Sequence, residues 1–306
     1  MTMSAAVLVT ALAASIWVTG APLRAQTPVE PPSAVASPEV LKVIQDPTSR
    51  LTLPVMIDGQ GPFDFLIDTG ADRTVISRQL AAKLDLPDGP TVLMHESAGD
   101  DDVKTVLIDH LAIGARIIRH VEAPALEADD LGAAGILGVD ALRDLHLVMD
   151  FKAMRLSSSP SRQEPLDPET IVVRGRSRYG QLILIDSKVR GVDVLVVLDS
   201  GSQLSLGNPA LLELLTGHAA GHEPRVTTQI VSVTGRKLTV ELDDIAETKV
   251  GGVVIRNMPM AFADLPIFGR FGLIRQPALL LGMDVLSKCS RVTIDLRRRE
   301  ATFTLN

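Results

Sequence analysis

The sequence is poor in cysteine, aromatic residues and clustered positive charge. Its 306 residues include one cysteine, and phenylalanine, tryptophan and tyrosine together make up 3% of the chain. The lone thiol of Cys289 cannot form an internal disulfide, so a disulfide-stabilised scaffold is excluded. The net charge is -7, and no basic run exceeds Arg297–Arg299. Because nucleic-acid binding requires a basic face and stacking rings, that class of partner is disfavoured.

A long apolar segment is also missing. The most apolar run, Ala5–Val18, has about 14 residues, fewer than the roughly 20 of a membrane-spanning helix. No charged side chain precedes Arg24, and Ala25 offers a small residue for cleavage. We expect residues 1–25 to be a signal peptide and the protein to be exported, either periplasmic or secreted. Because no lysine or arginine precedes the apolar run, an uncleaved N-terminal membrane anchor is the alternative.

What the chain does contain is enough apolar material for a sizeable core. Hydrophobic residues make up 46% and charged residues 22% of it, which is typical of a folded protein with one large domain or two smaller ones. A proline-rich stretch at residues 26–47 and a serine- and proline-containing stretch at residues 158–168 predict linkers. They leave an N-terminal lobe at residues 48–157 and a C-terminal lobe at residues 169–306.

Strands dominate the predicted secondary structure. Short alternating or apolar runs, broken by glycine, proline and aspartate, recur through both lobes, as in Leu51–Ile57 and Val192–Leu198. Few stretches are typical of helices, notably Arg78–Leu84 and Pro209–Leu215. The sequence therefore predicts an all-β fold with a few short helices.

The two lobes repeat each other. In the first lobe, the largely apolar run Phe63–Ile67, interrupted only by Asp64, leads into Asp68–Gly70, with the sequence Asp-Thr-Gly. In the second lobe, Val194–Leu198 leads into Asp199–Gly201, with the sequence Asp-Ser-Gly. Two motifs of one kind at matching positions indicate an internal duplication.

A second motif repeats downstream of the first. Gly135–Leu142 matches Leu279–Leu286, and each contains two apolar residues, a glycine and an aspartate two residues later. Both then lead into an alternating run, Leu147–Phe151 and Val292–Leu296. Because the aspartates Asp140 and Asp284 follow a glycine where a short helix would begin, we interpret them as structural residues.

These motifs resemble those of the aspartic peptidases of the retropepsin and pepsin clan. Leu66–Asp72 is similar to the retroviral-type active-site motif. The apolar runs ending at Gly138 and Gly282 resemble the clan's second motif, which packs beside the active-site loop. The resemblance covers residues 48–305 and is specific, because two motifs occur in order, twice. It implies two retropepsin-like β-barrel lobes related by pseudo-two-fold symmetry.

The resemblance also implies that Asp68 and Asp199 form a catalytic pair. Two carboxyl groups about 3 Å apart cannot both ionise cheaply, so they share a proton. The ionised member would activate a water, and the protonated member would donate to the scissile carbonyl. This chemistry requires no metal or cofactor and acts on a peptide or protein substrate. Since one chain carries both residues, we expect a monomer with an internal pseudo-dimer.

Further residues take roles from the same resemblance. Glycines allow close backbone approach, and short hydroxyls cross-link the two loops beneath the carboxyl groups. Support of the active-site loops is assigned to Thr69, Gly70, Ala71, Ser200, Gly201 and Ser202. The tips of two hairpins, called flaps, would close over the substrate, and the candidates are Ser97, Ala98, Gly99, Val233, Thr234 and Gly235. Neither flap carries a tyrosine, so both are closer to the retroviral kind.

Several alternatives stay open from the sequence. The chain could be a catalytically inactive module that binds peptides with the peptidase fold, or its halves could pair between chains in a swapped dimer. Asp72 and Arg73 either pair near the active-site loop or lie on the surface. His218 and His222 have a metal-like spacing, but their glycine-rich surroundings favour a loop over a metal site. The scarcity of aromatic residues predicts aliphatic substrate pockets and an apolar preference around the cut.

Overall fold

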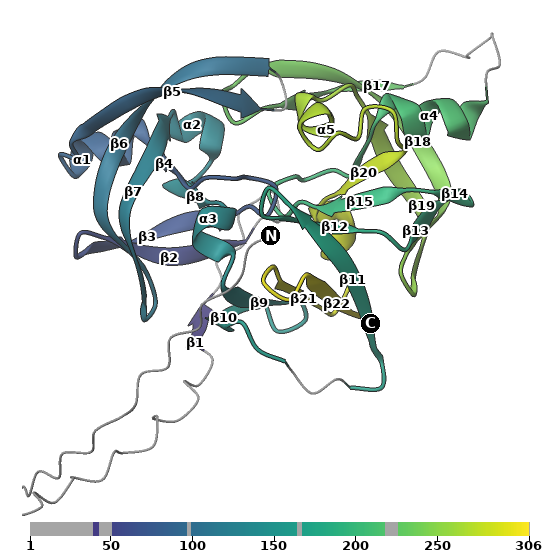
Figure 1. Cartoon of the computed structure of the whole chain (residues 1–306), viewed down its shortest axis with the longest axis horizontal. Helices are drawn as coiled ribbons and strands as arrows, with labels where there is room; N and C mark the ends of the chain where they lie inside the picture. The colour runs from purple at the N-terminus through teal and green to yellow at the C-terminus, as the bar shows by residue number, and fades with distance from the viewer. Residues whose placement is uncertain (1–38, 43–50, 97–98, 164–166, 218–225, 306) are drawn as a thin grey trace, which may run out of the picture. The chain divides into compact units, whose positions relative to one another are not determined.

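The computed structural model of the chain describes residues 39–42, 51–96, 99–163, 167–217 and 226–305 (Figure 1). The predicted signal peptide lies outside these ranges, as do most of the first predicted linker and both His218 and His222. Within the ranges that are described, no helix is long and apolar enough to cross a membrane. Strands make up 55% and helices 13% of the chain, so the predicted all-β class is confirmed.

The first lobe is a closed barrel of six strands. The strand order is β2-β3-β8-β4-β7-β6, and β2 also pairs with β6 to close it, while β5 extends the sheet beyond β6. The strands are β2 (Thr52–Ile57), β3 (Gln60–Ile67), β4 (Val75–Ser77), β5 (Asp88–Glu96), β6 (Gly99–Ile113), β7 (Arg116–Leu126) and β8 (Gly135–Leu137). The helices are α1 (Arg78–Lys83), α2 (Ala128–Leu131) and α3 (Val139–Leu142).

The second lobe repeats this arrangement with one strand divided in two. Its β12 pairs with β15 and its β13 pairs with β18, so together they take the place of β2. The strands are β12 (Gln181–Leu184), β13 (Ser187–Val189), β14 (Val192–Asp193), β15 (Leu195–Leu198), β16 (Leu206–Gly207), β17 (Thr227–Val231), β18 (Lys237–Val250), β19 (Val253–Phe262) and β20 (Ala278–Leu281). The helices are α4 (Pro209–Thr216), α5 (Pro266–Arg270) and α6 (Met283–Leu286).

The predicted helices begin where their capping residues place them. The Ser77 hydroxyl accepts a hydrogen bond from the Leu80 amide at the start of α1, at 3.2 Å. The Asn208 side chain accepts one from the Leu211 amide at the start of α4, at 2.9 Å, and proline occupies the first helical position. Each cap satisfies a backbone donor that the first turn of a helix leaves without a partner. Both helices predicted from the sequence are therefore confirmed.

A third group of strands joins the lobes. Their order is β1-β10-β9-β21-β22-β11, and the sheet continues into the second lobe through β12. They are β1 (Glu39–Lys42), β9 (Leu145–Asp150), β10 (Arg155–Pro160), β11 (Thr170–Arg178), β21 (Arg291–Asp295) and β22 (Glu300–Thr304). Strand β10 extends three residues into the predicted linker at residues 158–168, and β1 lies within the one at residues 26–47. One hydrophobic cluster runs through both lobes and this junction.

The central pairing of the junction carries two related ion pairs. Strands β9 and β21 are antiparallel, with Arg291 opposite Asp150 and Asp295 opposite His146. At one end, Arg291 Nη2 lies 3.3 Å from Asp150 Oδ2 and is accessible to solvent. At the other end, His146 Nδ1 lies 3.4 Å from Asp295 Oδ2, and both side chains are about 95% buried. Each ion pair thus joins two residues that lie directly opposite each other on β9 and β21, but one pair is buried and the other is exposed to solvent.

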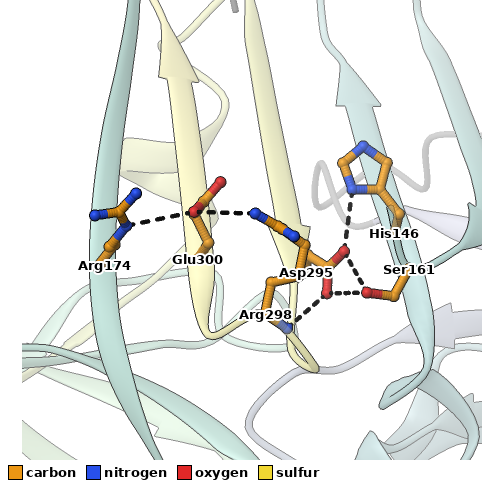
Figure 2. Close-up of polar contacts among 6 residues, drawn as sticks. All are labelled: His146, Ser161, Arg174, Asp295, Arg298 and Glu300. Carbon is orange, nitrogen blue, oxygen red and sulfur yellow. Dashed lines mark hydrogen bonds and ion pairs between the residues drawn. The ribbon is translucent and has the colours of Figure 1, made fainter. Parts of the chain in front are cut away.

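The buried pair belongs to a wider polar network, which Figure 2 shows. The Ser161 hydroxyl lies 2.8 Å from both carboxylate oxygens of Asp295, and the Arg298 amide donates to Oδ1 at 2.9 Å. Burial alone would raise the pKa of Asp295. Hydrogen bonds from His146, Arg298 and Ser161, together with the charge of His146, outweigh burial and lower it.

This network predicts a pH-dependent contribution to stability. Because the pKa of Asp295 is lowered in the folded state, its ionised form stabilises the fold above the ordinary carboxyl pKa, and that contribution is lost as the pH falls through the lowered value. We expect Asp295→Asn to reduce the free energy of unfolding by about 3 kcal/mol near neutral pH. The deficit should shrink in acid, measured by urea unfolding over a pH series.

Asp150→Asn is the matched control at the exposed end of the same strand pair. It should cost less than about 1 kcal/mol, because solvent screens an exposed ion pair. This account would be contradicted if both variants lost the same free energy of unfolding. It would also be contradicted if the loss for Asp295→Asn did not change with pH.

Candidate active site

Two strands with buried ends, β3 and β15, lead directly into Asp68 and Asp199, which lie close together. Strand β3 becomes fully buried over its last three residues, and β15 over its last three, before each chain turns. The Asp68 amide donates to the Leu137 carbonyl at 3.0 Å, and the Asp199 amide to the Leu281 carbonyl at 3.1 Å. Each turn is thereby held by a strand of the second sequence motif. This strand is β8, parallel to β3, in the first lobe and β20, parallel to β15, in the second.

Two hydroxyl groups lock the turns together across the lobes. Thr69 Oγ1 donates to the Leu198 carbonyl at 2.8 Å, and Ser200 Oγ donates to the Ile67 carbonyl at 2.9 Å. Each hydroxyl also accepts a hydrogen bond from the backbone amide of the other residue, both at 3.1 Å. Both side chains are buried, so solvent does not compete for these four hydrogen bonds.

Each carboxyl group is held by the backbone of its own loop. Asp68 Oδ1 accepts hydrogen bonds from the amides of Gly70 and Ala71, at 2.8 and 3.0 Å. Asp199 Oδ1 accepts the two equivalent bonds in the second lobe, at 3.0 and 3.1 Å. The bonds orient the two carboxyl groups in the same way relative to the pseudo-two-fold axis.

The two loop glycines allow the carboxyl groups to meet. A β-carbon on Gly70 would lie 2.7–2.9 Å from the Asp199 carboxyl atoms. A β-carbon on Gly201 would lie 2.3–2.6 Å from those of Asp68. Any larger residue at either position would therefore collide with the carboxyl group of the opposite lobe. Each aspartate is packed directly against the other loop.

The environment of the pair favours retention of a proton. Burial raises the pKa of Asp199 well above its ordinary value, and the negative charge of Asp68 raises it further. The amides of Gly201 and Ser202 oppose this increase, whereas a hydrogen bond with Asp68 adds to it. Asp199 therefore stays protonated at pH values at which an ordinary aspartic acid is ionised. The site can hold one protonated and one ionised carboxyl group together.

Two protein-family models match the chain, one in each lobe. Residues 53–144 match the family described as "gag-polyprotein putative aspartyl protease". Residues 185–285 match the family described as "Aspartyl protease". The chain belongs to the retropepsin-like aspartic peptidases. It carries their repeat twice in tandem, so the resemblance seen in the sequence is confirmed. A comparison with curated proteins gives no match.

Paired strands lead up to both predicted flap tips. Strands β5 and β6 pair as far as Glu96 and Gly99, and the predicted tip residues Ser97 and Ala98 lie outside the described residues. The second hairpin joins β17 to β18 through the turn Ser232–Arg236, which contains the other three candidates. In that turn the Ser232 amide donates to the Arg236 carbonyl at 2.8 Å.

The second hairpin reaches the first lobe. Val233 packs against a hydrophobic cluster that includes Leu131 and Ile136 of the first lobe. Arg236 forms an ion pair with Asp101 of β6, so the two hairpins are joined near their ends, where Figure 1 shows β5 and β17 meeting.

The contacts of Asp72 cross between the lobes and add two residues to the site. Its carboxylate forms an ion pair with Arg270 of α5, in the second lobe, and Oδ1 also accepts a hydrogen bond from Gln181. Gln181 is fully buried and donates to the Gly70 carbonyl at 3.2 Å. Asp72 and Arg73 do not pair, since Arg73 lies beside a glutamate of β7. No sequence motif marks Gln181 or Arg270.

A cavity of about 310 Å³ opens beside the active-site loop. Gly70–Arg73 and Val75 form one side, Val92–Met94 of β5 another, and Pro266–Ile267 of α5 a third. Most of these side chains are aliphatic, and the cavity contains no aromatic ring among the residues that the structure describes around it. The walls thus combine both lobes and the first hairpin.

The other residues singled out from the sequence have structural surroundings. Asp140 accepts hydrogen bonds from the amide and hydroxyl of Thr74, at 3.0 and 2.8 Å. Asp284 accepts one from the Ser205 hydroxyl at 2.7 Å. Both link a short helix to the segment after the active-site loop, as expected for structural aspartates. Burial raises the pKa of the Cys289 thiol to about 11, so it is a poor nucleophile.

The hydroxyl lock between the loops should contribute measurably to stability. Thr69→Ala removes one hydroxyl and leaves the Ser200 amide without its buried acceptor. We expect the free energy of unfolding to fall by about 1–3 kcal/mol. Thr69→Ser keeps the hydroxyl and copies the residue of the second lobe, so it should cost clearly less. Urea unfolding compares the two, and equal losses would show that the hydroxyl has no such role.

Proposed function

We propose that the protein is an aspartic endopeptidase that hydrolyses peptide bonds with the pair Asp68 and Asp199. The observation that carries this proposal is the reciprocal packing of each carboxyl group against the opposite loop. The raised pKa of Asp199 supports the assignment of roles. Asp199 holds the shared proton, and Asp68 is the ionised partner, although the pair titrates as a unit.

The proposed reaction needs only these two groups, a water and the substrate. Ionised Asp68 removes a proton from a water positioned between the carboxyl groups, while Asp199 donates its proton to the scissile carbonyl oxygen. The hydroxide equivalent attacks the carbonyl carbon and forms a tetrahedral intermediate. Asp68 then donates its proton to the leaving nitrogen while Asp199 takes a proton back from a hydroxyl of the intermediate, so the carbon–nitrogen bond breaks, acid and amine products form, and the dyad regains its starting protonation. The second hairpin and the cavity beside Ala71 would contact the substrate on either side.

We further propose that the peptidase acts as a monomer on peptides or proteins after export, in the periplasm or outside the cell. The leader-like pattern in residues 1–25 supports export, and the supply of both aspartates by one chain supports a monomer. Mass spectrometry of the purified protein would locate its first residue, and sedimentation would give its oligomeric state. If only a dimer were catalytically active, the proposal that the protein acts as a monomer would be wrong.

Loss of either aspartate should abolish cleavage. We expect the wild-type protein to cleave members of a mixed peptide library, read by mass spectrometry. Asp68→Asn and Asp199→Asn each remove a group that transfers a proton, and each should lose more than about 1,000-fold in kcat/KM. Urea unfolding would verify that both variants fold. Loss in one variant alone would contradict a shared dyad, and absence of cleavage by the folded wild type would overturn the proposed activity.

The pH profile should reflect the raised pKa of Asp199. Activity requires its protonated form, which persists above the ordinary carboxyl pKa of about 3.9 and is lost as the pH rises through the raised value. At low pH, activity falls when both carboxyl groups are protonated. The dependence of kcat/KM on pH should thus be bell-shaped, with its alkaline limb above about pH 4. An alkaline limb at or below that pH would contradict the role given to Asp199.

A further inference from the structure

The cavity beside the active-site loop carries an inference about the substrate, which rests on the proposed peptidase activity. Its aliphatic walls come from the first hairpin and from α5, and its lining includes Gly70. Since the Gly70 amide also binds the Asp68 carboxylate, the cavity lies next to the proposed site of cleavage. A substrate side chain close to the scissile bond can therefore enter it.

Two opposite charges line this otherwise apolar cavity. Asp72 comes from the first lobe and Arg270 from α5 of the second, and the two form an ion pair. Their side chains are 23% and 37% exposed, so solvent screens them only in part. Gln181 donates a hydrogen bond to the Asp72 carboxylate, and the Arg270 guanidinium lies 5.3 Å from the centre of the Tyr179 ring. Both charged groups are thus fixed in place.

A third charge at the cavity is positioned differently. The guanidinium of Arg73 also lines it, but its side chain is 57% exposed. Its Nη1 lies 3.4 Å from Glu122 Oε1, on the outer surface of β7. Solvent screening makes an exposed pair of this kind weak. Asp72 and Arg270 therefore dominate the local field at the cavity.

We propose that the Asp72–Arg270 pair determines specificity by making this cavity a subsite for an uncharged apolar side chain. Each charge cancels the other, so neither an acidic nor a basic substrate side chain gains a partner there. A charged side chain would lose hydration without compensation, whereas an aliphatic one gains burial against the walls. Removing one member of the pair exposes the other, which then attracts substrate side chains of the opposite charge.

Reciprocal variants test this proposal. Arg270→Met keeps an apolar stem beside Tyr179 and leaves the Asp72 carboxylate unbalanced, so lysine should be accepted in place of leucine. Asp72→Asn keeps an acceptor for Gln181 and leaves Arg270 unbalanced, so glutamate should be accepted. For each variant, the ratio of kcat/KM for the charged peptide to kcat/KM for the leucine peptide should rise about tenfold, which corresponds to about 1.4 kcal/mol. The double variant should return to the leucine preference.

The readout is a peptide library in which leucine, lysine and glutamate are scanned through each position. Cleavage by protein purified from expression of the full chain gives kcat/KM ratios. Binding is measured in parallel by fluorescence anisotropy in the Asp199→Asn background, which does not depend on turnover. Absence of wild-type cleavage would overturn the proposed function, while the binding preferences would still decide whether the pair controls the subsite.

Arg73→Met is the matched control, because it removes a positive charge from the same cavity. It should change the same ratios by at most about twofold, as expected for a screened exposed group. An equal shift for Arg73→Met and Arg270→Met would overturn the assignment to the ion pair. So would folded single variants whose preferences match the wild type, with the proposed activity intact. Urea unfolding separates these outcomes from loss of structure.

Discussion

The reciprocal hydrogen bonds of Thr69 and Ser200 are the constraint on which the rest of the site depends. They join two loops that are 131 residues apart in the chain and give a partner to both hydroxyl groups and both amides. With the loops fixed, the glycines bring each carboxyl group against the opposite lobe. That enforced closeness, together with burial, raises the pKa of Asp199 and keeps a proton in the site.

Much of this arrangement could be predicted because its signals are local in the sequence. An apolar strand followed by Asp-Thr-Gly or Asp-Ser-Gly specifies a buried strand and a tight turn, and its repetition specifies two lobes. The structure adds that Ser77 and Asn208 cap the starts of the two helices predicted from the sequence. The same local logic identified Asp140 and Asp284 as structural, since each follows a glycine at a helix start.

The contacts between lobes could not be predicted, because nothing near them in the sequence identifies the partner. Gln181 follows a turn and Arg270 ends a five-residue helix, and neither position has a motif. Their roles arise only when α5 is placed beside the first hairpin. The pairing of His146 with Asp295 depends in the same way on strand register, because a shift of one residue would turn one side chain to the other face.

A duplicated chain can differ where a symmetric dimer must be identical. Asp72, which lines the cavity, stands four residues after Asp68, whereas Gln203 stands at the same distance after Asp199, so the two active-site loops differ in charge. An extended peptide is also asymmetric, because it runs from an N-terminus to a C-terminus. Under the proposed function, two unlike loops would therefore give a bound peptide one preferred direction, which two identical subunits cannot do.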